Sequence, residues 1–142
     1  MSKKGSKDMM IADGMIMDRI YALRGKKVMI DEDLASLYHW EGERLRRLLV
    51  KNKKRFPEDF MFKLNSDDYK LLKSQDKNFD SRQFNGDFPL ALTEMGLAIL
   101  AGLVKTNRPV AVHICIIRMF NQLREMLPDY PGLRCELKKV FR

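Results

Sequence analysis

The sequence is poor in cysteine and has no long apolar run. Its 142 residues include two cysteines, Cys115 and Cys135, which lie 20 positions apart and form no CxxC pair. This usage is typical of two free thiols in a reducing cytoplasm, not of a disulfide framework or a zinc site. No stretch approaches the roughly 18 apolar residues of a transmembrane helix, and the start MSKKGSKDMMIADGM has no apolar segment long enough for a signal peptide. We expect a cytoplasmic protein without a membrane partner.

Motifs of catalysis, phosphate binding and metal binding are also absent. The chain has no GxSxG, HExxH, GxxxxGK[ST] or GxGxxG pattern. Its two histidines, His39 and His113, are far apart in sequence and form no metal-ligand motif. The acidic residues 31–33 stand at an expected helix start, where capping explains them better than a metal site. We predict no enzyme activity, no catalytic or metal-binding residue, no cofactor and no small-molecule substrate.

What the chain does have is a concentrated excess of positive charge. A length of 142 residues with 45% hydrophobic and 32% charged residues suits one globular domain, and the formal net charge is +8. Residues 41–55 hold seven Arg or Lys against two Glu, a local net charge of +5. Most of the excess therefore lies in about a tenth of the chain, and such a focus favours a polyanion as partner.

The beginning of the chain predicts a tail and a β-hairpin. Residues 1–14 are polar and rich in methionine without a clear period, and we expect a flexible tail there. β-Prone residues flank Arg24-Gly25-Lys26 within 18–31, and Gly25 can take the positive φ that a tight turn requires. A hairpin is the preferred interpretation. The alternative is a short helix over 14–23 followed by a turn.

Residues 31–54 predict two consecutive helices. Asp31 suits the N-cap of the first, which should end near His39 or Trp40 because Gly42 interrupts the pattern. Gly42 is then an acceptable N-cap for the second helix. That helix has two faces, each within about 100° of arc at the helical period. The apolar face consists of Leu45, Leu48, Leu49 and Asn52, and the basic face of Arg44, Arg47, Lys51 and Lys54.

The remaining chain alternates short strands and helices. We predict a strand over 60–64, a helix over 66–75 capped by Ser66, a polar loop over 76–87, a strand over 88–92, a helix over 94–105 capped by Thr93, and a long helix from Asn107 or Pro109 to about Leu127.

The long helix carries two apolar lines. One repeats at intervals of four and three residues and consists of Val112, Ile116, Met119, Leu123 and Met126; the other consists of Val110, Ile114, Ile117 and Phe120. A helix packed on one domain needs a single stripe, so two stripes indicate one for the core and one for a partner, such as a second copy. We assign the first line to the partner surface. A central helix buried on most sides is the alternative.

The basic helix is the main functional candidate. A solvated helix face is often rich in Arg and Lys, but such a face usually mixes charges, and here no acid follows Glu43 until after Arg55. A shorter helix and a tight turn before it match the order of a helix-turn-helix, whose second helix enters the major groove. Further cations on the hairpin and after the helix suit flanking phosphates. The predicted nucleic-acid-binding residues are Arg44, Arg46, Arg47, Lys51, Lys53, Lys54, Arg55, Arg24, Lys26 and Lys27.

Two longer segments carry a family resemblance. IYALRGKKVMIDEDLASLYHWEGERLRRLLVKNKKRFPEDFMFKL resembles the ORF6N domain, a DNA-binding module related to the KilA-N and Bro-N domains of phages and large DNA viruses. LALTEMGLAILAGLVKTNRPVAVHICIIRMFNQLRE is similar to the later part of the same family. The chain departs from the family pattern at four positions. His39 replaces a usual Gly, Gly42 a capping Thr, Arg46 a frequent Asn and Val50 a usual Lys. The last two are expected to point outward, so the sequence specificity of relatives does not transfer.

These observations predict a small α+β single domain with short β-hairpins or strands, a helix-turn-helix-like pair and a long C-terminal helix. The domain should span 15–127, with 128–142 as a tail or the start of a following segment. The resemblance implies a bacterial or prophage transcription regulator or anti-repressor, associated with the nucleoid, that places its basic helix (42–54) on double-stranded DNA. The alternative is a protein-interaction or oligomerisation module without direct DNA binding.

Overall fold

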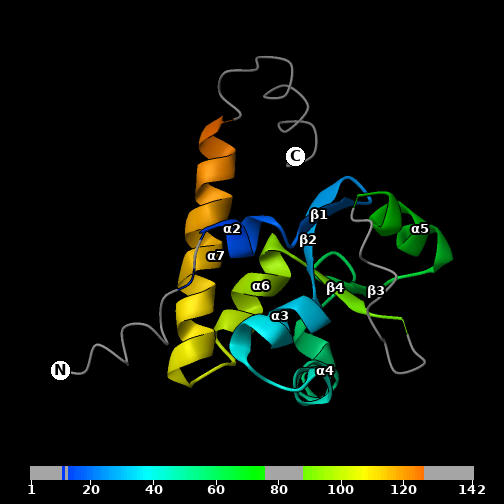
Figure 1. Cartoon of the computed structure of the whole chain (residues 1–142). Coiled ribbons are helices and arrows are strands. Elements are labelled where there is room, and N and C mark those ends of the chain that lie inside the picture. The colour runs from blue at the N-terminus through cyan, green and yellow to red at the C-terminus, as the bar shows by residue number, and fades with distance from the viewer. Residues whose placement is uncertain (1–10, 12, 76–87, 127–142) are drawn as a thin grey trace.

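The computed structural model describes residue 11, residues 13–75 and residues 88–126 (Figure 1). The predicted loop over 76–87, the segment 128–142 and Cys135 lie outside the described residues. In chain order the elements are α2 (Asp13–Met17), β1 (Ile20–Leu23), β2 (Lys26–Ile30), α3 (Asp31–Tyr38), α4 (Gly42–Lys51), the 3₁₀ helix η1 (Lys53–Arg55), β3 (Met61–Lys63), α5 (Ser66–Gln75), β4 (Leu90–Thr93), α6 (Glu94–Ala101) and α7 (Asn107–Met126). The predicted α+β class is confirmed.

The four strands form one antiparallel sheet in the order β1-β2-β4-β3. The predicted hairpin is β1 and β2, and its two-residue turn has positive φ at both Arg24 (52°) and Gly25 (73°). Two positive φ values define the type I′ turn, whose twist matches that of the flanking strands. The short-helix alternative was wrong for 20–23, although the helix α2 lies just before the hairpin and overlaps the end of the predicted tail.

Each face of the sheet buries its own row of side chains, because successive residues of a strand point to opposite faces. The row Met29–Leu92–Met61 runs across three paired strands and belongs to the larger core, together with helices α3, α4, α6 and α7. The row Ile30–Ala91–Phe62 faces the other way and packs with Leu72 of α5. The sheet thus separates α5 from the other helices (Figure 1).

Helix α7 is anchored to the end of α3. Arg108 Nε donates a hydrogen bond to the Leu37 carbonyl oxygen at 2.8 Å, and the Tyr38 hydroxyl is hydrogen-bonded to Nε2 of the buried His113. These contacts hold the N-terminal half of the long helix against the helix pair that carries the basic face.

The assignment of the α7 stripes was wrong. Val112, Ile116 and Met119 are buried in the domain's own core, and Leu123 packs against it. Of the other line, Phe120 is also buried, whereas Val110, Ile114 and Ile117 are exposed by 39%, 45% and 57%. The side chain of Met126 lies outside the described residues. The apolar surface available to a partner is therefore Val110, Ile114 and Ile117.

Three predicted helix starts need correction. Helix α3 begins at Asp31 itself, since Ile30 takes the extended N-cap position, and α4 begins at Gly42 after Glu41. In α5 the capping residue is Asn65, not Ser66. Its side chain accepts from the Asp68 amide and its own amide donates to the Asp68 carboxylate, both at 2.9 Å. This reciprocal pair satisfies two amides at once.

Helix α6 starts as predicted but ends earlier. The Thr93 hydroxyl oxygen accepts a hydrogen bond from the Gly96 amide, which confirms the predicted cap. The helix stops at Ala101 instead of Lys105, and residues 102–106 form the connection to α7. Within the described ranges, no helix has the length and apolar character needed to cross a membrane.

Candidate nucleic-acid interface

Helices α3 and α4 are joined by a three-residue turn that begins with a left-handed residue. His39 has φ 63° and ψ 37°, its amide donates to the Ser36 carbonyl at 3.1 Å, and the Trp40 amide donates to the Ala35 carbonyl at 2.8 Å. These two bonds form a Schellman motif, which ends α3 sharply. The turn therefore redirects the chain at once into α4, as the helix-turn-helix prediction requires.

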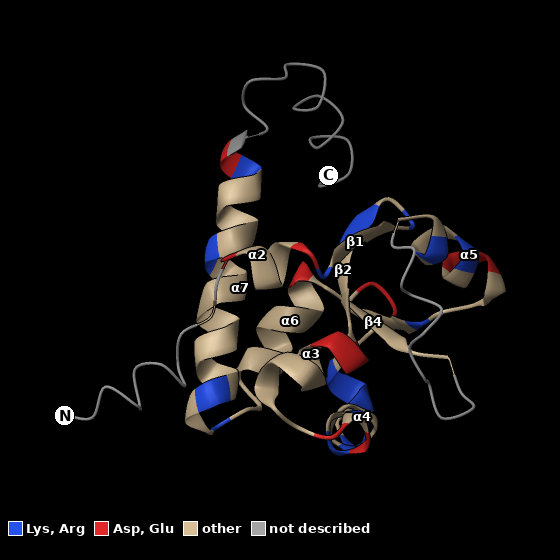
Figure 2. Ribbon diagram, viewed as in Figure 1, with Lys and Arg blue, Asp and Glu red and all other residues tan. Residues whose placement is uncertain are grey.

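Helix α4 has one buried and one basic face, as predicted, but it ends at Lys51 instead of Lys54, which lies on the separate 3₁₀ helix η1. Leu45 and Leu49 are fully buried, and Leu48 is half-buried at the edge of the core. Arg44, Arg47 and Lys51 are exposed on the other side. Figure 2 shows Lys and Arg gathered on α4, with further cations at the start of α7. The buried leucines fix the rotation of α4, and that rotation presents the cations to solvent.

Arg46 does not point outward as expected. Its guanidinium donates a hydrogen bond to the Phe88 carbonyl at 3.0 Å and lies 3.7 Å from the carboxylate of Asp31. Arg46 flanks the helix between its two faces, and its long side chain reaches back to the segment that enters β4. Arg46 therefore connects α4 to the segment that enters β4 and to the start of α3, and we do not assign it to the interface.

Asp31, the ion-pair partner of Arg46, also bonds to two backbone amides. The carboxylate is buried and accepts hydrogen bonds from the Glu32 amide at 2.9 Å and the Leu90 amide at 3.2 Å. Burial raises the pKa of Asp31 to about 6, although Arg46 and the two amides act in the opposite direction. A carboxyl in this environment links the start of α3, the start of β4 and the flank of α4.

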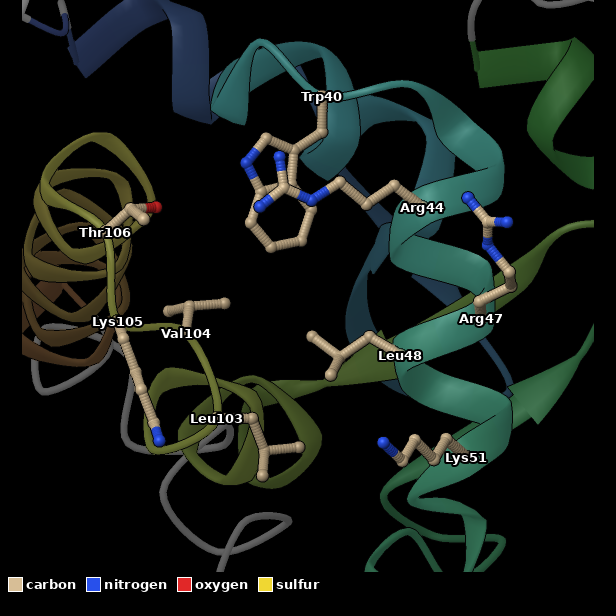
Figure 3. Close-up of a pocket in the computed structure, with 9 residues that line it drawn as sticks. All are labelled: Trp40, Arg44, Arg47, Leu48, Lys51, Leu103, Val104, Lys105 and Thr106. Carbon is tan, nitrogen blue, oxygen red and sulfur yellow. The ribbon is translucent and has the colours of Figure 1, made fainter.

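A cleft of about 370 Å³ opens beside the basic face (Figure 3). The guanidinium of Arg44 lies over the ring of Trp40 with 3.8 Å to the ring centroid, which is a cation–π contact. Trp40 in turn meets Tyr38 edge-on at 5.1 Å between centroids. The lining residues come from the turn, from α4 and from the α6–α7 connection, and they are Trp40, Arg44, Arg47, Leu48, Lys51, Leu103, Val104, Lys105 and Thr106.

The other predicted cations fall into two groups. Lys53, Lys54 and Arg55 are exposed on η1, directly after α4, and they extend the basic surface. The hairpin cations lie elsewhere, because β2 runs from the turn to the start of α3 and so places the turn at the far end of the sheet (Figure 1). Lys26 and Lys27 are exposed there. The structure does not bring the hairpin group and the α4 group together.

Arg24 is engaged within the fold. Its guanidinium binds the Asp68 carboxylate through Nε at 3.3 Å and a terminal nitrogen at 2.7 Å, and it lies 4.1 Å from the centroid of the Phe62 ring. The hydrogen bonds to Arg24 lower the pKa of Asp68 and raise that of Arg24. Arg24 therefore connects the hairpin turn to α5 and does not extend the basic surface of α4.

Sequence reasoning missed Trp40 and Lys105 as members of this surface. Trp40 stood at an expected helix end, and Lys105 was counted as the last residue of a helix. Their proximity to Arg44 and Lys51 depends on how α7 returns to α3, which no local pattern encodes. Within the described part of the chain, no group of three or more His, Cys, Asp or Glu side chains is placed to hold a metal ion.

A comparison with protein families gives one match. The model of the ORF6N domain matches residues 18–103, from the start of the hairpin through α6, which is more than half of the chain. The chain belongs to the ORF6N family. This is a family of phage and prophage proteins, and the match includes the helix pair, the 3₁₀ helix and the whole sheet. Comparisons with curated proteins and with solved structures gave no match.

Proposed function

We propose that this ORF6N protein binds double-stranded DNA through α4 and η1. The observation that carries the proposal is the division of α4 into a face locked in the core by Leu45 and Leu49 and a face that presents Arg44, Arg47 and Lys51. Cations on a rigid helix that follows a tight turn suit a DNA groove and its phosphate rims. The phage and prophage setting of the family supports a role as a transcription regulator or anti-repressor in the bacterial cytoplasm.

The test compares two triple variants with the same loss of charge. Arg44→Ala, Arg47→Ala and Lys51→Ala together remove the α4 cations, and Lys63→Ala, Lys70→Ala and Lys73→Ala together remove three exposed lysines from β3 and α5. Binding to random-sequence duplex DNA is measured against salt. Each lost phosphate contact reduces the slope of log K against log salt by about 0.9, so the α4 variant should lose up to about 2.7. Equal slopes for both variants would show that α4 is not the interface.

We also propose that two copies associate through the outer face of α7. Val110, Ile114 and Ile117 repeat at intervals of four and three residues along a 20-residue helix and are exposed. Such a stripe can pack against its own copy about a two-fold axis, because each residue then meets a residue from the same patch. A dimer would also offer two α4 helices to two half-sites of one duplex.

Ile117→Glu is the sharpest test of this association, with Leu71→Glu as its control. The two side chains have similar exposure, 57% and 51%, but Leu71 lies on α5 across the sheet. Sedimentation of the wild-type protein should show a concentration-dependent dimer that Ile117→Glu abolishes and Leu71→Glu retains. A wild-type protein that stays monomeric at all concentrations, with or without DNA, would refute the dimer. A dimer that ignores DNA would instead favour a pure interaction module.

A further inference from the structure

The cleft beside α4 has a second wall that carries its own cation. Arg44, Arg47 and Lys51 line one side from α4, and Lys105 lines the other from the connection between α6 and α7 (Figure 3). Lys105 lies just beyond the residues that match the ORF6N model. The two walls therefore combine a helix within the matched region with a residue that follows it.

The connection is held on both sides of Lys105. Before it, the Val104 side chain is buried and the Val104 amide donates to the Leu100 carbonyl at 3.2 Å. After it, Arg108 is bonded to the Leu37 carbonyl at the end of α3. The backbone of Lys105 is thus fixed relative to the helix pair, while its side chain is exposed. A fixed backbone limits the entropy lost when the ammonium group binds a ligand.

The cleft combines an apolar interior with a cationic rim. Leu48, Leu103 and Val104 supply aliphatic surface, and the four cations stand around it. Among the described residues, the nine that line the cleft include no carboxylate. A sugar–phosphate strand has the complementary chemistry, since the deoxyribose carbons are apolar and each phosphate carries one negative charge.

We propose that Lys105 binds DNA and that the cleft clamps the backbone of one strand between Lys105 and the cations of α4. This inference rests on the proposed function of α4. It adds a contact from outside the helix-turn-helix and identifies the strand backbone as the group that enters the cleft. An acidic peptide is a poorer fit, because the exposed cations continue beyond the cleft along Lys53–Arg55 and match a polyanion that also continues.

Lys105→Ala is compared with Lys70→Ala, which removes an exposed lysine of α5. Both side chains are exposed, so neither change should shift the urea midpoint of unfolding, and urea unfolding of both variants verifies this. On random-sequence duplex DNA, Lys105→Ala should reduce the salt slope by about 0.9, and Lys70→Ala should leave it unchanged. A full slope for Lys105→Ala, together with a reduced slope for the α4 triple variant, overturns this inference alone. Unchanged slopes for both overturn the inference and the proposed function.

Two further measurements separate a direct contact from a general charge effect. In the wild-type protein, bound duplex DNA should protect Lys105 from acetylation by a lysine reagent, as read by mass spectrometry, and should leave Lys70 reactive. Equal acetylation of Lys105 with and without DNA contradicts the clamp.

Poly-glutamate serves as a probe for acidic peptides in the cleft. If Lys105→Ala weakens binding to poly-glutamate but not to duplex DNA, the cleft takes acidic peptides and the inference is wrong.

Discussion

The Tyr38 hydroxyl is hydrogen-bonded to Nε2 of His113, and this contact joins the last residue of α3 to the buried side of α7. The ring centroids lie 5.6 Å apart with a tilt of 46°. Nδ1 of His113 is buried and has no hydrogen-bond partner among the described residues. An imidazole with one unsatisfied nitrogen in an apolar site resists protonation, and burial lowers the pKa of His113 to about 4.

His113 should make the protein less stable as the pH falls from about 6.5 to about 4. The unfolded imidazole has a pKa of 6.5 and the folded one about 4, so in this window only the unfolded state binds the proton. The contribution of His113 to the free energy of unfolding is therefore complete above about pH 6.5, and it is lower by about 3 kcal/mol below about pH 4. Urea unfolding of wild type and His113→Gln across this range measures the difference, which should shrink as the pH falls. A constant difference would show that His113 titrates normally in the folded protein.

Asp31 should act in the opposite direction. Its pKa rises from 3.8 to about 6 on folding, chiefly through burial, so between these values only the folded state holds the proton. The contribution of Asp31 to stability therefore declines by about 3 kcal/mol as the pH rises from about 4 to about 6. Asp31→Asn removes this titration. The free energy of unfolding of the wild type minus that of the variant should fall as the pH rises. A difference that rises with pH would contradict the raised pKa of Asp31.

The two titrations offset each other in the wild-type protein. Between pH 4 and 6, loss of stability through Asp31 accompanies gain through His113, so these two groups together give a nearly flat profile. The single variants should expose slopes of opposite sign, and the double variant should again be flat with respect to these groups. Matched urea titrations of the four proteins test this directly. Slopes of the same sign in the two single variants would refute the compensation.

Features that depend on neighbouring residues could be predicted from the sequence. Gly25 indicated the hairpin turn, Thr93 capped α6, and the spacing of Leu45 and Leu49 fixed the rotation of α4. Turn geometry, capping and amphipathic spacing act within one or two helical turns of the chain. The basic face of α4 followed from these local signals.

Features that depend on distant packing could not be predicted. Both lines of α7 are apolar and share the helical period, so the packing of α2, α3 and α6 against α7 decides that Val112 is buried and Ile114 exposed. The sequence predicted Arg46 as a surface cation, but the segment that enters β4 places the Phe88 carbonyl within hydrogen-bond distance of its guanidinium. The position of Lys105 opposite α4 depends on how α7 packs against the end of α3. In each case the deciding partner is at least 30 positions away or belongs to another element.

His39→Gly should stabilise the protein by about 1 kcal/mol. His39 holds φ 63°, a region that costs a residue with Cβ about 1 kcal/mol or more and that glycine adopts freely. The imidazole is exposed, so its removal costs little packing. Urea unfolding of His39→Gly and His39→Ala distinguishes relief of the backbone from loss of the side chain. Only the glycine variant should gain stability, and an equal gain in both would assign the effect to the imidazole.

Gly96→Ala should be among the most damaging small substitutions in the chain. A Cβ at this position would lie 2.0 Å from the Phe60 carbonyl oxygen, a backbone atom that no rotamer change can move. That oxygen also accepts the Thr93 amide at 3.0 Å, so α6 is pressed against the segment that enters β3. We expect a loss of about 3 kcal/mol, because α6 must shift to admit the methyl group. Urea unfolding of Gly14→Ala provides the control, since nothing lies within 4 Å of a Cβ there and the helix propensity of alanine is higher. If the two variants unfolded at the same urea concentration, the close approach of α6 to Phe60 would be wrong, and with it the position of the connection that carries Lys105.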